Sequence, residues 1–254
     1  MIRNSLVFLI IGVLIAQDFT PEEILSYVAS HPKPDNSITE IRLEITRKKK
    51  NKTKTKVREF TRYEKIYKSG KFKSKSLARF QKPKIVKGTS FLSWVYDNGK
   101  TVQWFSLPKI KKAKKVKAKE KSKSFLNTDF TYEDLENRSL GSDSLVNIGS
   151  EYLNGSQCKV IMAWPKGPSS YFSRKIWVNS QTWRISKVEY YISESKKDKT
   201  LYVSDFINKN GFSIAGKMIM EKENGNKTVM EVMSYKPDIG LKDEVFTIDF
   251  LVKK

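Results

Sequence analysis

Hydrophobic and polar residues alternate with a period of two along most of the chain from Ile38 onward. In residues 41–46, for example, three aliphatic side chains alternate with Arg42, Glu44 and Thr46. This period is that of a β-strand with one face buried. Comparable runs predict strands at 72–80, 90–96, 101–107, 145–152, 159–164, 171–178, 184–192, 201–207, 213–221 and 228–235.

The breaks between these runs have the composition of tight turns. They include Asp97-Asn98-Gly99, Asn154-Gly155 and Asn224-Gly225, which are typical of β-hairpins. Few residues separate successive runs, and no long helical pattern lies between them, so neighbouring strands are expected to be antiparallel. We therefore predict an α+β, mainly β protein whose strands form one large antiparallel sheet in a single domain, residues 17–254.

A single helix is predicted before the strands. Thr20 can cap its first turn, Pro21 suits the first helical position, and Glu23 can bond back to the cap. The sequence His31-Pro32-Lys33-Pro34 ends it. His31, the only histidine of the chain, is interpreted as part of this helix end.

Residues 1–16 have the pattern of a signal peptide. Arg3 precedes an apolar run at 5–15, which is shorter than the roughly 20 residues that span a bilayer. We expect cleavage after Ala16 and export to the periplasm, with an uncleaved short anchor as the alternative. Gln17 stands where a lipoprotein would have cysteine, so the chain itself is not expected to be lipidated.

Composition removes several classes of function. With one cysteine, Cys158, the chain forms no intramolecular disulfide and no multi-cysteine metal site. No nucleophile elbow, phosphate loop or dinucleotide fingerprint occurs. The acidic residues Asp129, Glu133, Asp134 and Glu136 are best explained by capping of a short helix. We therefore expect no enzyme, no cofactor and no metal site.

The net charge of +22 is concentrated in two basic blocks, Arg47–Arg58 and residues 109–123. The first is predicted to form the tip of a hairpin. Either the blocks are solvated loops, or they dock the protein on an anionic membrane surface or a partner. Nucleic acid is not expected, because the aromatic residues follow no RNA-binding pattern. The candidate docking residues are Lys48, Lys49, Lys50, Lys111, Lys112, Lys114 and Lys115.

Several short motifs occur in a characteristic order and spacing. They include Phe80-Gln-Lys-Pro83, residues 104–108 (WFSLP), residues 129–135 (DFTYEDL) and Ile176-Trp177-Val178. In this order the chain resembles the outer-membrane lipoprotein-sorting proteins, the LolA-like family. The resemblance implies an open half-barrel with short helices covering its concave face, and a hydrophobic cavity that holds acyl chains.

Alternation suggests which side chains line this cavity. On one predicted strand Leu92, Trp94 and Tyr96 form the bulkier face, so we expect this face to be the covered one. A hairpin at Asn98-Gly99 would bring Trp94 beside Trp104. Two phenylalanines flank an irregular segment that could cross the cavity mouth. The candidate lipid-binding residues are Leu92, Trp94, Tyr96, Val102, Trp104, Phe125 and Phe130.

Two functional hypotheses follow. The first is a periplasmic carrier that shields the acyl chains of a lipoprotein or lipid and meets an inner-membrane transporter or an anionic membrane surface. The second is an accessory subunit of an export pump or envelope assembly that carries no cargo. Apolar side chains left accessible on the concave face would favour the carrier, and a fully packed interior would favour the accessory subunit.

Overall fold

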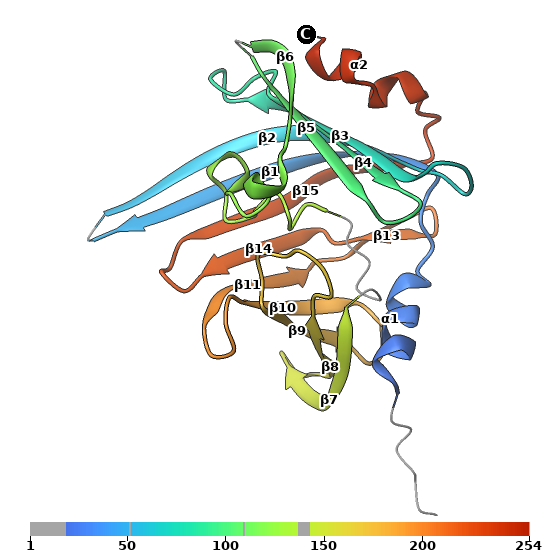
Figure 1. Cartoon of the computed structure of the whole chain (residues 1–254), viewed down its shortest axis with the longest axis vertical. Helices are drawn as coiled ribbons and strands as arrows, with labels where there is room; N and C mark the ends of the chain where they lie inside the picture. The colour runs from blue at the N-terminus through green and yellow to red at the C-terminus, as the bar shows by residue number, and fades with distance from the viewer. Residues whose placement is uncertain (1–18, 51, 109, 137–142, 254) are drawn as a thin grey trace, which may run out of the picture.

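A computed structural model describes residues 19–50, 52–108, 110–136 and 143–253 (Figure 1). The predicted signal peptide, residues 1–16, lies outside the described residues. Thirteen strands form one antiparallel sheet in the order β6-β5-β4-β3-β2-β1-β15-β14-β11-β10-β9-β8-β7. Their bounds are β1 Asn36–Lys49, β2 Lys52–Ile66, β3 Phe72–Lys82, β4 Ser90–Tyr96, β5 Thr101–Leu107, β6 Ile110–Lys115, β7 Ser144–Leu153, β8 Ser156–Trp164, β9 Ser173–Asn179, β10 Ile185–Tyr191, β11 Lys197–Ser204, β14 Lys217–Lys222 and β15 Lys227–Pro237.

The sheet is curved and remains open, as predicted (Figure 1). Strands β6 and β7 are its two edges. A separate hairpin of β12 (Ile207–Lys209) and β13 (Phe212–Ile214) interrupts the run that the sequence indicates as one strand at 213–221. The basic insert also contains an unpredicted strand, β6, which pairs with β5.

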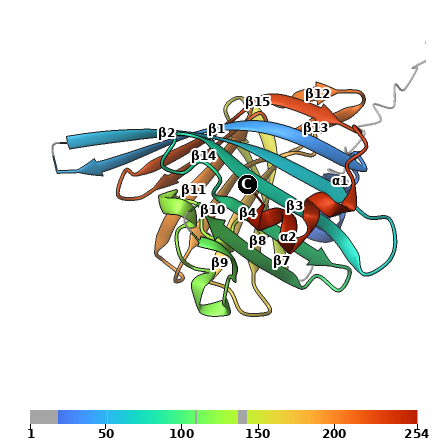
Figure 2. The same cartoon turned by 90° about the horizontal axis from the view of Figure 1, so that it is seen from above.

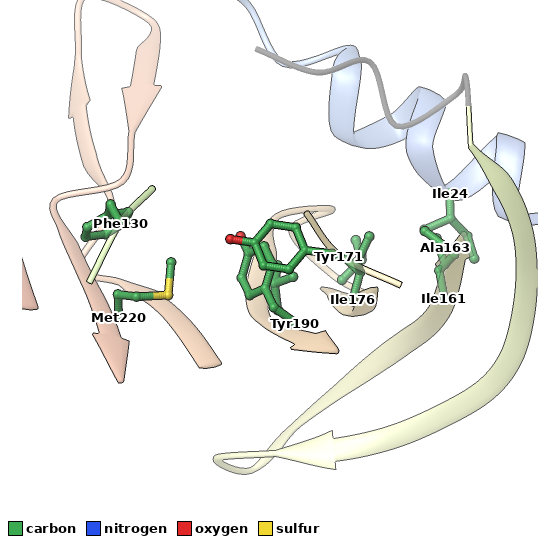
Figure 3. Close-up of a cluster of buried hydrophobic side chains, with 10 residues drawn as sticks. Ile24, Phe130, Ile161, Ala163, Tyr171, Ile176, Tyr190 and Met220 are labelled. Carbon is green, nitrogen blue, oxygen red and sulfur yellow. The ribbon is translucent and has the colours of Figure 1, made fainter. Parts of the chain in front are cut away.

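The predicted helix is confirmed as α1 (Pro21–Ala29). The Thr20 hydroxyl accepts from the Glu23 amide, and the Glu23 carboxylate accepts from the Thr20 amide, which is the reciprocal capping box expected from the sequence. Ile24 is the buried residue of this helix and packs against Ile161 and Ala163 of β8 (Figure 3). This contact places α1 on the concave side of the sheet.

Residues 116–136, here called the crossing segment, run across the same concave side. The segment includes two short 3-10 helices, η1 (Ala118–Glu120) and η2 (Phe125–Asn127). Phe125 packs against Phe80 and Phe91 of the sheet, and Phe130 belongs to the cluster that contains Tyr171 and Tyr190 (Figure 3). Much of the concave face is therefore filled by the chain itself.

The convex, outer face is covered at one end by the C-terminal residues. A 3-10 helix, η4 (Asp243–Phe246), leads into α2 (Ile248–Val252), which lies against β4, β5 and β6 (Figures 1 and 2). Phe246 and Leu251 pack on Leu77 and Leu92 in an almost fully buried cluster. The short helix α2 thus covers the outer face, in addition to α1 on the concave face, where the resemblance implies short helices.

Candidate functional site

The crossing segment is held on the concave face by buried ion pairs. Asp129, whose side chain is 3% exposed, accepts from Arg47 of β1 at 2.7 Å. It also accepts from the Thr228 hydroxyl of β15 at 2.7 Å, and its amide donates back to that hydroxyl. These bonds join the segment to the two central strands of the sheet.

A second attachment centres on Lys199 of β11, which is fully buried. Its ammonium donates to Asp134 at 2.5 Å and to the carbonyl oxygen of Asp129 at 3.1 Å. Asp134 also accepts from the Tyr171 hydroxyl at 2.8 Å. Burial, followed by the nearby charge of Asp134, raises the pKa of Tyr171, so this phenol remains a proton donor.

A third attachment joins Glu133 to Arg174 of β9, 3.0 Å apart. Arg174 also contacts Asp143 at 3.4 Å. Burial disfavours the charge on Glu133, but hydrogen bonds from Ser169 and Ser170 and the charge of Arg174 outweigh it and hold the pKa of Glu133 below its ordinary value. The carboxylate is therefore ionised at neutral pH.

Three of these acidic residues thus form ion pairs with distant parts of the chain, in addition to the capping predicted from the sequence. Local capping is present, since the Thr131 amide donates to Asp134 at 2.6 Å and the Asp134 amide donates to the Thr131 hydroxyl at 3.2 Å. The cationic partners of Asp129, Glu133 and Asp134 come from distant strands, whereas Glu136 pairs with Lys121 of the crossing segment at 2.7 Å. In the described part of the chain, no group of three or more potential ligands could hold a metal ion. A sequence signal for a buried charge was present, because the period of two places Lys199 on the same strand face as Leu201 and Val203.

Two cavities remain between α1 and the concave face. The first, about 390 Å³, lies over β9, β10 and β11. Val28 of α1 closes one side of it, Val188 and Leu201 form its apolar floor, and Glu133 and Arg174 lie at its polar end. Its aliphatic and aromatic lining also includes Ile176, Trp183, Ile185, Tyr190, Val203 and Phe206.

The second cavity, about 550 Å³, lies over β1, β2 and β3. Leu25 and Val28 of α1 face a more polar floor, which includes Ser37 and the ion pair of Arg62 with Glu64 at 2.7 Å. Val28 and Ser213 line both cavities. The two cavities are therefore neighbours beneath α1, and from here on the pair is called the groove.

The predicted lipid-binding residues are divided between the two faces of the sheet. Trp94 and Trp104 lie side by side, 4.7 Å between ring centroids, as the predicted hairpin requires. They belong to the outer face, because the Trp94 indole donates to the Phe246 carbonyl and both rings pack against the C-terminal cluster. Leu92, Tyr96 and Val102 share this face by register.

The remaining two candidates, Phe125 and Phe130, lie on the concave side but are buried within the packed core. None of the seven candidates lines the groove. On β4 and β5 the concave face instead carries Phe91, Val95 and Phe105. Lipid binding by the seven residues stays a prediction.

The predicted docking lysines also occupy different positions. Lys48, Lys49 and Lys50 lie at the end of the β1–β2 hairpin and are exposed. Lys112, Lys114 and Lys115 belong to β6 and are exposed as well. The side chain of Lys111 lies outside the described part of the structure. In the described ranges, no helix has both the length and the apolar character needed to cross a bilayer.

Comparison with solved structures identifies the fold. A domain from Vibrio parahaemolyticus described as an outer membrane lipoprotein-sorting protein is 24% identical with a TM-score of 0.82, covering 91% of this chain and 97% of that chain. A DUF1329 family protein from Desulfovibrio piger is 25% identical with a TM-score of 0.81, covering 90% and 96%. A LolA superfamily protein from Nitrosomonas europaea is 19% identical with a TM-score of 0.69, covering 92% and 100%.

Comparison with protein sequences adds a family assignment. No curated protein matches the chain. A family model described as "Uncharacterized protein" matches residues 72–253, which include every strand from β3 to β15 and the C-terminal helix. The chain therefore belongs to the family that this model describes, and it has the LolA-like fold of outer-membrane lipoprotein-sorting proteins.

Proposed function

We propose that this protein is a non-enzymatic periplasmic carrier that shields the acyl chains of a lipid or lipoprotein in the groove beneath α1. The single observation that carries the proposal is the pair of neighbouring cavities that share Val28 as a lining residue. Each volume falls in the range of about 300–1,000 Å³ that is typical of small-molecule sites. The likeness of the fold to a lipoprotein-sorting domain supports the same class of cargo.

The lining of the first cavity suits an acyl chain. Its floor is aliphatic and aromatic, and burial of apolar surface stabilises binding by roughly 25 cal/mol per Å² without any catalytic group. Its polar lining includes the ion pair between Glu133 of the crossing segment and Arg174 of β9. An ester or amide at the end of the acyl chain can be hydrogen-bonded there while the hydrocarbon stays in the apolar part.

The test is lipid uptake by the protein purified from a bacterial periplasm without detergent, followed by native mass spectrometry and by titration with a fluorescent fatty acid. Val28→Trp places an indole in the lining that the two cavities share and is expected to weaken binding at least about tenfold. Val146→Trp on the exposed side of β7 is the matched control and should bind as the wild type does.

A second variant separates the groove from the outer face. Trp94→Ala/Trp104→Ala removes the indoles that pack against the C-terminal cluster and should leave uptake intact in the folded protein. Uptake lost in this variant and retained in Val28→Trp would move the binding site to the outer face. A wild-type mass without lipid, and no uptake of added lipid, would favour the accessory subunit without cargo.

A further inference from the structure

The β1–β2 hairpin extends beyond the strands on either side of it (Figures 1 and 2). β15 pairs with β1 only as far as Thr46, opposite Lys227, and β3 pairs with β2 only from Glu59, opposite Lys82. In the ribbon of residues 47–58, residues 47–49 and 52–54 therefore pair only with one another among the described strands, and residues 55–58 have no partner on the β3 side. Such a free ribbon is accessible from both faces.

Register places six of the eight positive charges of residues 47–58 on one face. Directly opposite residues of an antiparallel pair point to the same side of the sheet. The register pairs Lys49 with Lys52, Arg47 with Lys54, Ile45 with Lys56 and Leu43 with Arg58. The resulting row, here called the cationic stripe, consists of Arg47, Lys49, Lys52, Lys54, Lys56 and Arg58.

The cationic stripe continues the concave face of the sheet. Leu43 and Ile45, which share its side, are buried in the inner core. At its base, Arg47 binds Asp129 and Arg58 donates to the carbonyl oxygen of Leu126, both in the crossing segment. The opposite face of the ribbon carries Thr46, Lys48, Thr53, Thr55 and Val57.

The outer lysines of the stripe have no charge partner nearby. Lys49, Lys52, Lys54 and Lys56 are exposed, and no ion pair joins them to any residue within the described ranges. Residues 47–58 contain no Asp or Glu. Side chains on one face of a strand repeat every ~7 Å, so the stripe presents a row of cations to a surface with many anions.

We propose that the cationic stripe docks the protein on a bilayer rich in anionic phospholipid, with the concave face turned toward the membrane. Lysines near such a surface are attracted to lipid phosphates, and several act together. The ribbon has no aromatic residue for base stacking, which favours phospholipid over single-stranded nucleic acid. This docking requires no cargo in the groove.

The experiment is cosedimentation of the full protein with vesicles of phosphatidylcholine that contain phosphatidylglycerol, compared with phosphatidylcholine alone. K52Q/K54Q/K56Q is expected to lower the partition coefficient about a hundredfold at low salt. Added salt should weaken wild-type binding because exposed charges are screened. Circular dichroism and thermal unfolding show whether each variant folds.

The matched control moves the charges without changing their number. The variant K52T/T53K/K54T/T55K/K56V/V57K keeps the composition and the net charge but places the three lysines on the opposite face of the ribbon. Binding close to that of K52Q/K54Q/K56Q supports the stripe. Wild-type binding by this variant, equal binding to both kinds of vesicle, or tighter face-dependent binding to a DNA oligonucleotide would each overturn the proposal.

Discussion

The two faces of the sheet are covered by different kinds of contact. On the outer face, Phe246 and Leu251 bury Leu77 and Leu92 in an apolar cluster. On the concave face, the crossing segment packs Phe125 and Phe130 against the sheet but also brings three buried carboxylates to cations of the sheet. Strands β3 and β4 therefore contribute an apolar contact on the outer face, whereas β1, β9 and β11 contribute directional polar contacts on the concave face.

This difference bears on how the groove is formed. Apolar burial is non-directional, so it holds α2 against the sheet without requiring one register. Buried ion pairs add little net stability compared with well-packed apolar residues, but a single broken pair leaves a costly charge. Pairing Asp134 with Lys199 and Glu133 with Arg174 therefore favours one position of the crossing segment, and that position forms the polar end of the groove.

The largest effect is expected from Lys199→Met. The substitution keeps most of the apolar side chain but leaves Asp134 buried without its cation, so the free energy of unfolding should fall by about 3–5 kcal/mol at pH 7. Urea unfolding measures this loss. Asp134→Asn in the same chain removes the stranded charge and should restore part of the stability.

Lys197→Met is the matched control for that substitution. Lys197 lies on the same strand, is partly exposed, and pairs with Glu189 and Glu223 at 3.6 and 3.3 Å. An exposed pair contributes only about 0–1 kcal/mol, so this variant should be nearly as stable as the wild type. An equal fall in the free energy of unfolding in the two variants would show that breaking the buried pair costs no more than breaking a partly exposed one.

On the outer face, Leu92→Ala is expected to lower the free energy of unfolding by about 2–5 kcal/mol, because it opens a cavity beneath the C-terminal cluster. The loss should be the same at neutral and mildly acidic pH, since the residue contacts apolar side chains. Ile85→Ala at an exposed position is the control, with a change within about 0.5 kcal/mol. A loss of stability that grew or shrank with pH would contradict a purely apolar outer contact.

Local features of the fold were accessible from the sequence. The capping box at Thr20, the turn at Asn98-Gly99 and the alternation in residues 90–96 and 101–107 each act over a few residues. Their prediction needed no knowledge of the rest of the chain. The resemblance to a family then supplied the open, curved sheet that local patterns cannot indicate.

Local patterns could not predict which side chains of a strand point to the concave face of the sheet. Alternation groups Leu92 with Trp94 and Phe91 with Val95, but it does not say which group faces inward. The bulkier group lies outside because Phe246, more than a hundred residues later, covers it. The ion pair of Lys199 with Asp134 likewise joins residues 65 positions apart, so the groove depends on contacts that only the folded chain brings together.

The smallest expected effect concerns acid stability and Glu133. Because the pKa of Glu133 is lowered in the folded protein, its stabilising contribution is present above the ordinary pKa of about 4.3 and is lost as pH falls through the lowered value. Glu133→Gln should therefore cost about 1–3 kcal/mol at pH 7, with the difference from wild type vanishing in acid. Urea unfolding between neutral and acidic pH measures it, with Glu221→Gln at an exposed position as the control. A difference that persisted at the lowest pH would show that Glu133 acts through packing, and that the charge of Arg174 does not hold the crossing segment.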